Sequence, residues 1–377
     1  MKKFIAFICL FCIFPFSTYA LDLAPSASSV ILLEPTTGEI IYERDSDVKL
    51  NPASMTKMMS MLLIVEAIED GLIAWDDMVR VSANAASMGG SQILLEENEE
   101  MSVEDLFKGV TIASGNDAVV ALAEKVAGTE EQFVLMMNER ASELGLENTV
   151  FQNPHGLDEA NHYSTAYDMA IIASELVSHE VVLEYTSIYE TYLREDTDQK
   201  IWLVNTNKLV RFYEGMDGLK TGYTTEAGYC LTATAMIGNT RFIAVVMGEP
   251  DSNTRNAEMT EIMDYAFSQY EIETLISKDT TIELKQIDKS VNRVVEIVPL
   301  EDINVLNLKT GENENISYDV FIDKIDAPLS YGDVVGNVTL DDGRVIELTV
   351  KEDVVACNLF QLFIQTLSDI VTGEIIY

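Results

Sequence analysis

A serine and a lysine three positions apart, at the start of an apolar segment, are the residues whose types and spacing most clearly suggest chemistry. Ser54 and Lys57 lie in Ser54-Met55-Thr56-Lys57, and the residues that follow as far as Val65 are almost all apolar. Residues three apart share one face of a helix, so the hydroxyl and the amine can meet. Burial favours the neutral amine, which could take the proton of an attacking serine. The pair predicts nucleophilic catalysis, with Ser54 as nucleophile and Lys57 as proton acceptor.

A second polar group follows about sixty residues later, in Ser114-Gly115-Asn116. The tripeptide reads as a turn just before a new helix, where a hydroxyl and a carboxamide could reach the same pocket. We expect Ser114 to relay a proton towards the leaving amine, and Asn116 to hold the substrate amide or to orient Lys57. The alternative for Ser114 is an ordinary helix N-cap.

A third group, Lys220-Thr221-Gly222-Tyr223, precedes a β-like run. An edge strand there could pair with an extended peptide. Lys220 would add positive charge beside the nucleophile, and Gly222 would leave room for the ligand. The backbone N–H groups of Ser54 and Tyr223 are the candidates for an oxyanion hole, in which losing one donor typically costs about 3 kcal/mol in the barrier. The alternative is a surface strand with one solvated lysine.

The surrounding pattern predicts one α/β or α+β domain over residues 21–273, because strand patterns flank a helical middle. A hairpin is expected around Pro35-Thr36-Thr37-Gly38, and a second around Gly238-Asn239. Asn51 and Pro52 suit the start of a buried helix that carries Ser54. Further helices are expected over 103–112, 117–126, 130–144, 165–178 and 256–270.

Short alternating strands then predict a small all-β domain over 274–352. The last segment, 353–377, has an amphipathic helical pattern. Its polar face holds Asn358, Gln361, Gln365, Ser368, Asp369 and Thr372. Such a helix could lie in a membrane surface. The alternative is a helix docked on the β-domain, which the absence of Lys and Arg after Lys351 favours.

The first twenty residues predict a signal peptide, because two lysines precede an apolar run and Thr18-Tyr19-Ala20 offers a small-residue cleavage site. Two of the four cysteines would leave with it. The remaining two, Cys230 and Cys357, lie far apart and suggest no disulfide framework. The chain is therefore expected to be exported.

The formal charge of −39 argues against nucleic acid as a partner, since phosphates would be repelled. His155, His162 and His179 are too scattered to predict a metal site. His155 is expected to be a packing residue in a turn. No cofactor is predicted.

Together and in this order, the three motifs resemble those of the low-molecular-weight penicillin-binding proteins, in the D-alanyl-D-alanine carboxypeptidase family. The resemblance extends to His155-Gly156-Leu157-Asp158, to Asp217-Gly218-Leu219 and, in the β-domain, to Ala327-Pro328-Leu329. It covers nearly all of the chain after residue 20. It implies a β-lactamase/transpeptidase-like catalytic domain with a helical cluster and an antiparallel sheet.

The resemblance implies a reaction and its partners. Ser54 is acylated by the penultimate D-Ala of a peptidoglycan stem peptide, D-Ala is released and the acyl-enzyme is hydrolysed. Penicillins would acylate the same serine as inhibitors. Arg255 resembles the family arginine that helps bind the terminal carboxylate, with Thr221 as the other contact. Tyr223 stands where some members of the family carry a histidine. This difference in side chain does not remove the backbone N–H donor at that position.

The C-terminal helix resembles the family's membrane anchor in position and amphipathicity, although its polar face lacks basic residues. The resemblance therefore implies a periplasmic protein, peripheral on the outer face of the cytoplasmic membrane.

Three alternatives remain. A class A β-lactamase would need a Glu-x-x-Leu-Asn loop, and no such stretch occurs between Asn116 and Lys220. A D,D-endopeptidase would use the same residues, and the β-domain argues for the carboxypeptidase. A non-catalytic peptidoglycan-binding or morphogenetic protein would not need the intact set of Ser54, Lys57, Ser114, Asn116 and Lys220.

Overall fold

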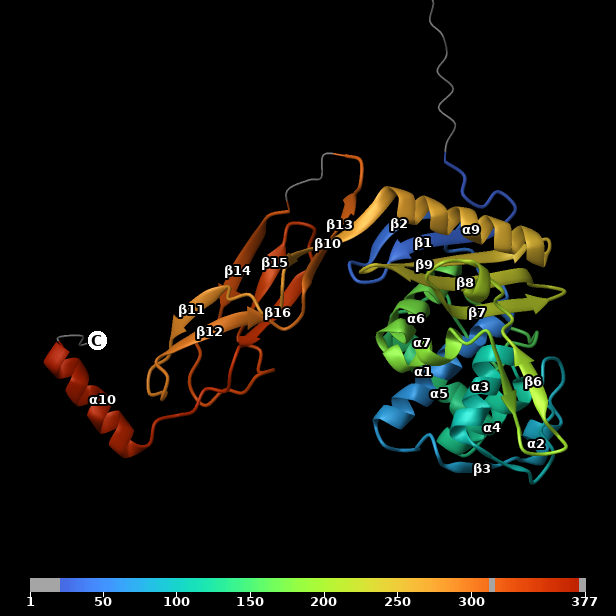
Figure 1. The fold of residues 1–377 in the computed structure, drawn as a ribbon, viewed down its shortest axis with the longest axis horizontal. Coiled ribbons are helices and arrows are strands. Elements are labelled where there is room, and N and C mark those ends of the chain that lie inside the picture. The colour runs from blue at the N-terminus through green and yellow to red at the C-terminus, as the bar shows by residue number, and fades with distance from the viewer. Residues whose placement is uncertain (1–20, 312–315, 373–377) are drawn as a thin grey trace, which may run out of the picture.

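The computed structural model describes residues 21–311 and 316–372. The predicted signal peptide lies outside these ranges. A large mixed domain is followed by an elongated β-domain, and a final helix stands at the far end of the molecule (Figure 1). The expected order of domains along the chain is therefore the order in which the parts appear.

A five-stranded antiparallel sheet forms the centre of the large domain, in the order β2-β1-β9-β8-β7. Its strands are β1 (Ser29–Glu34), β2 (Glu39–Arg44), β7 (Met216–Thr224), β8 (Gly228–Ile237) and β9 (Thr240–Glu249). Both predicted hairpins are confirmed, β1–β2 around Gly38 and β8–β9 around Gly238. Strand β7 lies at the edge of the sheet, as predicted, and leaves one side of its backbone open.

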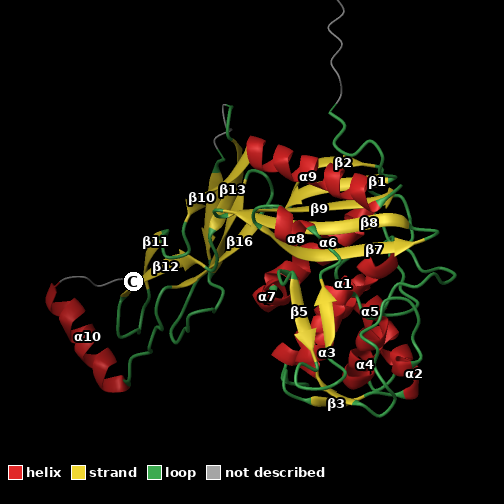
Figure 2. Ribbon diagram, turned by 45° about the vertical axis from the view of Figure 1, so that its right-hand side comes forward, coloured by secondary structure: helices red, strands yellow, loops and turns green. Residues whose placement is uncertain are grey.

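Helices cover both faces of this sheet (Figure 2). On one face lie η1 (Ala53–Thr56), α1 (Lys57–Glu69), α2 (Ala83–Ala86), α3 (Val103–Ala113), α4 (Asn116–Ala127), α5 (Glu130–Glu143), α6 (Ala166–Ser178) and α7 (Glu180–Thr186), while the short helix α8 (Leu209–Phe212) contributes Leu209 to the core on the opposite face. On the other lies α9 (Ser252–Gln269). Ile31 and Leu33 of β1 face the helical cluster, whereas Val30 and Leu32 face α9. Alternate side chains of β1 thus point into two separate hydrophobic cores, one on each face of the sheet.

Helix α1 is buried all round, as its uniformly apolar sequence predicts, and it forms the middle of the helical cluster. Two small ribbons border that cluster, β3 (Met78–Arg80) with β4 (Glu100–Ser102) and β5 (Glu190–Leu193) with β6 (Ile201–Val204). These ribbons were not predicted, since strands of three or four residues carry too little alternation.

Helix α9 begins four residues earlier than predicted. Asp251 caps it by accepting hydrogen bonds from the backbone N–H groups of Asn253 and Thr254. Arg255 consequently lies in the first turn of α9, not in the connection before it.

The β-domain contains a two-stranded ribbon, β10 with β13, and a five-stranded sheet in the order β11-β12-β16-β15-β14. The strands are β10 (Tyr270–Ile276), β11 (Glu283–Gln286), β12 (Val294–Pro299), β13 (Ile303–Leu308), β14 (Tyr318–Ile322), β15 (Gly336–Leu340) and β16 (Val345–Val350). The boundary expected between residues 273 and 274 falls inside β10. Because β10 pairs with β13 from Tyr270 onwards, the whole strand goes with the β-domain.

The C-terminal helix α10 spans Leu359–Thr372. It contacts the β-domain through its polar face, where Gln365 donates to the carbonyl of Ser290 and Asp369 pairs with Arg293 at 2.6 Å. Its apolar side chains are largely exposed, Phe363 by 60% and Val371 by 84%. Helix α10 therefore docks on the β-domain through its polar face, as one alternative predicted, and keeps its apolar face exposed. Among the described residues, no helix is long and apolar enough to cross a membrane.

Candidate active site

Ser54 lies in a 3₁₀ turn, not in the first turn of an α-helix as predicted. Ala53 before it has a left-handed backbone (φ 48°), and Asn51 accepts a hydrogen bond from the N–H of Ala53. Gly156 packs so tightly against this turn that a Cβ there would collide with the carbonyl of Ala53. In a 3₁₀ turn, residues three apart eclipse one another. The turn therefore brings Ser54 and Lys57 together more directly than an α-helix would.

Lys57 is fully buried and its Nζ has three polar neighbours. These are Ser54 Oγ at 3.0 Å, Asn116 Oδ1 at 2.6 Å and the carbonyl oxygen of His155 at 2.7 Å. Burial holds the pKa of Lys57 well below its usual range, and the charge of Lys220 lowers it further. A neutral amine fits this environment, since its two N–H groups can donate to the two carbonyl oxygens while its lone pair faces the Ser54 hydroxyl.

Asn116 begins α4 and is fixed at both ends of its amide. Its Oδ1 accepts from Lys57, and its Nδ2 donates to the carbonyl of Gly89 at 2.7 Å. Of the two roles expected for Asn116, the geometry favours orienting Lys57. The next residue, Asp117, is buried and accepts from the backbone N–H groups of Ile93 and Leu95, which anchors the loop before it.

Ser114 lies between α3 and α4, as predicted, with a left-handed backbone (φ 62°) and a nearly buried side chain. It ends α3, whereas Gly115 caps α4, so the helix N-cap alternative is wrong. No hydrogen bond joins Ser114 Oγ to Ser54, Lys57 or Lys220 among the described contacts. A left-handed non-glycine residue is uncommon and often marks a functional turn.

Lys220 is fully buried in β7, so the solvated-lysine alternative is wrong. Burial, with the nearby charge of Arg255, lowers the pKa of Lys220 to about 7. Gly222 faces the nucleophile turn, since a Cβ there would lie 2.7 Å from the carbonyl oxygen of Pro52 and 3.3 Å from the N of Ser54. The glycine leaves room for that turn and not, as expected, for a ligand.

The remaining β7 residues line the open edge. Thr221 Oγ1 donates to Thr206 Oγ1 at 2.8 Å. Tyr223 is 54% exposed, and its ring lies against that of Tyr229 with centroids 4.3 Å apart. The approach of Gly222 to the backbone N of Ser54 brings β7, the strand that carries Tyr223, against the nucleophile turn. The oxyanion hole formed by the backbone N–H groups of Ser54 and Tyr223 stays a prediction.

Arg255 reaches from α9 to the sheet. Its guanidinium donates to Asn256 Oδ1 and, at 3.5 Å, to the carbonyl of Cys230. Cys230 lies opposite Gly222 in the β7–β8 register. The structure thus brings Arg255 to the Lys220-Thr221-Gly222 segment, where sequence spacing alone could not place it. Cys230 and Cys357 are both free.

Two buried histidines support the nucleophile turn. His162 contacts Thr56 Oγ1 at 2.8 Å and accepts from the N–H of Gln152, while His155 accepts from the N–H of Leu157. Burial lowers the pKa of His155 to about 3 and that of His162 to about 4, so both rings are neutral at pH 7. His155 does more than pack in a turn, because its carbonyl holds Lys57.

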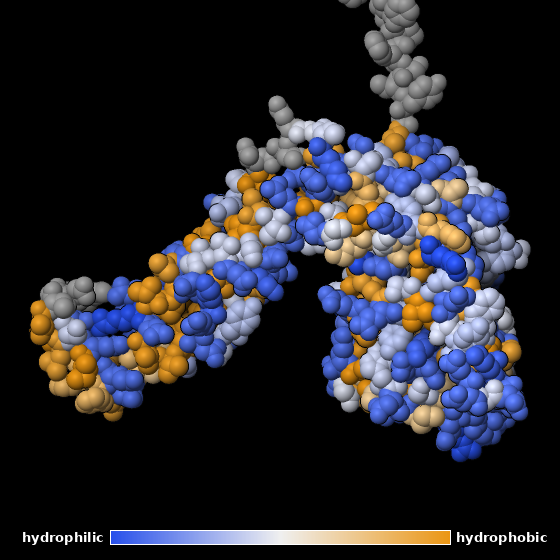
Figure 3. Space-filling view, in the orientation of Figure 1, coloured by the Kyte–Doolittle hydropathy of each residue, from blue (hydrophilic) through white to orange (hydrophobic). Residues whose placement is uncertain are grey.

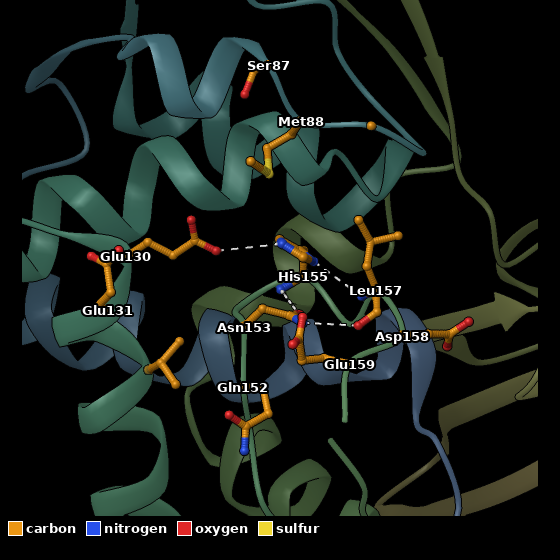
Figure 4. Close-up of a pocket in the computed structure, with 12 residues that line it drawn as sticks. Ser87, Met88, Glu130, Glu131, Gln152, Asn153, His155, Leu157, Asp158 and Glu159 are labelled. Carbon is orange, nitrogen blue, oxygen red and sulfur yellow. Dashed lines mark hydrogen bonds and ion pairs between the residues drawn. The ribbon is translucent and has the colours of Figure 1, made fainter. Parts of the chain in front are cut away.

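A hollow of about 610 Å³ borders the loop that carries His155 (Figure 4). Glu130 points into it towards the His155 ring, 3.6 Å away. Two of its wall residues, His155 and Gly89, are those whose carbonyls hold Lys57 and Asn116. Sequence reasoning missed both, because a backbone carbonyl carries no residue-type signal.

Comparison with known proteins gives the same assignment. Residues 17–251 match the family model described as D-alanyl-D-alanine carboxypeptidase, and residues 270–356 match the C-terminal domain of penicillin-binding protein 5. The D-alanyl-D-alanine carboxypeptidase DacF of Bacillus subtilis is 48% identical over 353 residues, 92% of this chain and 91% of that protein. DacC of Escherichia coli is 37% identical, with 93% and 90% covered.

Solved structures agree. Penicillin-binding protein 5 of Haemophilus influenzae has a TM-score of 0.71 at 33% identity, covering 88% of this chain and 98% of that one. Penicillin-binding protein D2 of Listeria monocytogenes, solved in an ampicillin-bound form, has a TM-score of 0.59 at 31% identity, with 66% and 100% covered. With its buried serine–lysine pair and its two matched domains, the chain belongs to the D-alanyl-D-alanine carboxypeptidase family of low-molecular-weight penicillin-binding proteins.

Proposed function

We propose that this serine D-Ala-D-Ala carboxypeptidase works through an acyl-enzyme on Ser54, with Lys57 as its base. The observation that carries the proposal is the set of three contacts around Lys57 Nζ, two to carbonyl oxygens and one to Ser54 Oγ. That set leaves the amine lone pair directed at the nucleophile's proton.

In the acylation step, Ser54 Oγ attacks the penultimate D-Ala carbonyl and its proton passes to Lys57. Backbone N–H groups of Ser54 and Tyr223 stabilise the resulting oxyanion. As the C–N bond breaks, Ser114 relays a proton to the departing amine and D-Ala leaves. Water, activated by Lys57, then hydrolyses the ester and restores Ser54.

Substrate binding is assigned to the edge of β7. An extended peptide pairs with the open strand, Lys220 provides positive charge, and Thr221 and Arg255 hold the terminal carboxylate. The burial of Lys220 and Arg255 supports these roles, since a buried cation near an anion's site interacts more strongly than an exposed one. A penicillin places a carboxylate and a reactive amide in the same positions.

The test is release of D-Ala from a pentapeptide ending in D-Ala-D-Ala, run beside a crosslinked peptide dimer. We expect the mature protein to release D-Ala and its Ser54→Ala variant to release none. Cleavage of the dimer without release of D-Ala would favour the endopeptidase, and no reaction with either substrate would refute the enzyme.

Export and a peripheral position on the outer face of the cytoplasmic membrane are part of the proposal. The sequence of residues 1–20 supports export, and the exposed apolar side chains of α10 support surface contact. Figure 3 shows these hydrophobic side chains gathered at the end of the molecule far from the catalytic domain. The membrane surface would then hold the enzyme by one end.

A further inference from the structure

Arg255 is a buried cation without a carboxylate partner. Arg255 is only 5% exposed. The described hydrogen bonds of its guanidinium go to one side-chain amide oxygen and one backbone carbonyl oxygen. Within 21–311 and 316–372, no ion pair includes it. An uncompensated buried charge is costly, and an arriving carboxylate relieves that cost. If a carboxylate of the protein itself paired with Arg255, the substrate's carboxylate would lose this partner. Selective binding of the substrate therefore requires that the neighbouring carboxyl groups do not pair with Arg255.

The nearest such group is Glu249, the last residue of β9. It is 1% exposed, and neither of its carboxyl oxygens accepts a hydrogen bond from a donor in the described chain. Its carboxyl adjoins that of Glu258 on α9, whose two oxygens each accept from the backbone N–H of Ser26 at 3.2 Å. A proton on Glu249 can be donated to the Glu258 carboxylate, so the two groups can share one proton.

The fold places this carboxyl pair beside Arg255. Glu249 lies opposite Tyr229 in the β8–β9 register, and the next residue of β8, Cys230, offers the carbonyl that Arg255 contacts. Glu258 follows Arg255 by three positions, on the same side of α9. A negative charge on Glu249 would act on the Arg255 guanidinium, raising its pKa. An ionised Glu249 would therefore offer Arg255 an internal counter-ion.

We propose that the Glu249–Glu258 carboxyl pair is a positioning element for the carboxypeptidase reaction: by sharing a proton it keeps Glu249 neutral and leaves the charge of Arg255 for the substrate's terminal carboxylate. The inference rests on the proposed role of Arg255. Neither glutamate touches the substrate, and both act through Arg255.

Burial, followed by the contact with Glu258, raises the pKa of Glu249 to about 8. Other charged or titratable groups face it from each neighbouring element. They are Arg44 of β2, Asp251 at the start of α9, Glu258 and Arg255 of α9, and Tyr229 and Cys230 of β8. Only Arg44 and Arg255 favour ionisation, and Arg44 is already bound to Asp22 and to the carbonyls of Ala24 and Ala27.

The measurement is a selectivity ratio. It compares kcat/KM for a D-Ala-D-Ala peptide with a free carboxylate against kcat/KM for the same peptide as its C-terminal amide. Both substrates undergo the same chemistry, so the titration of Lys57 cancels in the ratio. Because the charge of Lys220 also titrates in this range, every enzyme compared carries Lys220→Arg, which keeps that charge fixed, and wild type refers to the residues at positions 249 and 258. With a pKa of about 8, the neutral fraction of Glu249 falls about tenfold between pH 7 and pH 9, and the wild-type ratio should fall about tenfold with it. Glu249→Gln should keep the ratio constant.

A second pair of variants separates this role from a structural one. In Glu258→Gln, Glu249 loses the neighbouring negative charge and gains an amide donor, so it should ionise at pH 7 and lower the ratio several-fold. The double variant Glu249→Gln/Glu258→Gln carries the same change at the contact with Ser26 but has no carboxylate, and it should restore the ratio to within about twofold of wild type. Thermal unfolding of each variant shows whether it is folded at the assay temperature.

A wild-type ratio independent of pH from 7 to 9, or a double variant as impaired as Glu258→Gln, would overturn the inference. Both outcomes differ from failure of the proposed function, in which the wild type would cleave the terminal peptide bond of neither substrate.

Discussion

Lys57 Nζ lies 3.0 Å from Ser54 Oγ in a site where both remaining contacts of the amine are carbonyl oxygens. Carbonyl oxygens only accept hydrogen bonds, so the neutral amine donates its two N–H groups to them. Its lone pair is then free to accept the proton of the Ser54 hydroxyl. Burial lowers the pKa of Lys57 in the same direction. Geometry and electrostatics therefore both support the role proposed for this lysine, that of the base.

Lys57→Arg tests that role, because a guanidinium stays protonated and cannot accept the Ser54 proton. We expect the rate of acylation by benzylpenicillin to fall by about 10²- to 10⁴-fold, the usual contribution of a general base. Lys324→Arg, at an exposed position in the β-domain, is the control and should react like wild type. Acylation of Lys57→Arg at the wild-type rate would exclude Lys57 as the base.

The lowered pKa of Lys220 predicts that the pH profile of acylation has an alkaline limb, a decline in rate as Lys220 loses its proton. With a pKa of about 7 it is charged below pH 7 and neutral above, so the charged fraction falls about tenfold from pH 6 to pH 8. If the charge attracts the ligand, kcat/KM for benzylpenicillin should fall in the same interval. Lys220→Arg should remove this limb. The same decline in Lys220→Arg as in wild type would assign the limb to another group.

Gly222→Ala tests the contact between β7 and the nucleophile turn. The added methyl group would lie 2.7 Å from the carbonyl oxygen of Pro52, so the turn must move. We expect acylation to slow at least tenfold, since displacing a reacting group by about 1 Å can cost that much or more. Gly311→Ala adds a methyl at an ordinary contact distance in the β-domain and should leave the rate unchanged. Equal rates for both variants would contradict the assigned role of Gly222.

The histidines predict loss of stability in acid. His155 and His162 have lowered pKa values in the folded state, about 3 and about 4, whereas the unfolded chain binds their protons below about 6.5. The free energy of unfolding should therefore fall as the pH drops from about 6.5 to about 4, by up to about 1.4 kcal/mol per pH unit for each histidine. Urea midpoints measured over this range check it. His162→Gln should have a shallower slope, and an unchanged slope would show that His162 does not contribute.

The C-terminal helix predicts binding to lipid vesicles through its apolar face. Phe363→Asp should weaken binding to zwitterionic vesicles, measured by co-sedimentation, by about tenfold or more, since a buried aromatic side chain contributes about 1.5–3 kcal/mol. Phe321→Asp in β14 is a matched control, because Phe363 and Phe321 are both 60% exposed. The lack of basic residues after Lys351 predicts weaker binding to anionic vesicles. Equal effects of the two substitutions would contradict a role for α10 in binding.

Much of this fold could be predicted from periodicity. The helices from Val103 to Ser178 begin and end within about two residues of their predicted bounds, because Ser102, Thr129 and Thr165 cap three of them through side-chain hydrogen bonds. The start of α9 was missed because the prediction began the helix at Asn256 and did not use Asp251 as its N-cap. The 3₁₀ turn at Ser54 was missed because its cause, the close packing of Gly156 and Gly222, lies far away in sequence.

In the site, side chains were predictable and backbone groups were not. Ser54, Lys57 and Asn116 meet as their spacing and residue types suggested. The carbonyls of His155 and Gly89, which complete the environment of Lys57 and Asn116, depend only on tertiary packing. The carboxyl pair of Glu249 and Glu258 likewise could not be predicted, because the sequence contains 63 acidic residues and nothing in it distinguishes these two.

The most direct test of Ser54 as the acylated nucleophile is intact-mass spectrometry of the mature protein after reaction with benzylpenicillin, followed by peptide mapping. We predict one added penicilloyl group, carried by the peptide that contains Ser54, and no adduct in Ser54→Ala. An adduct on any other residue, or an adduct that persists in Ser54→Ala, would contradict the account.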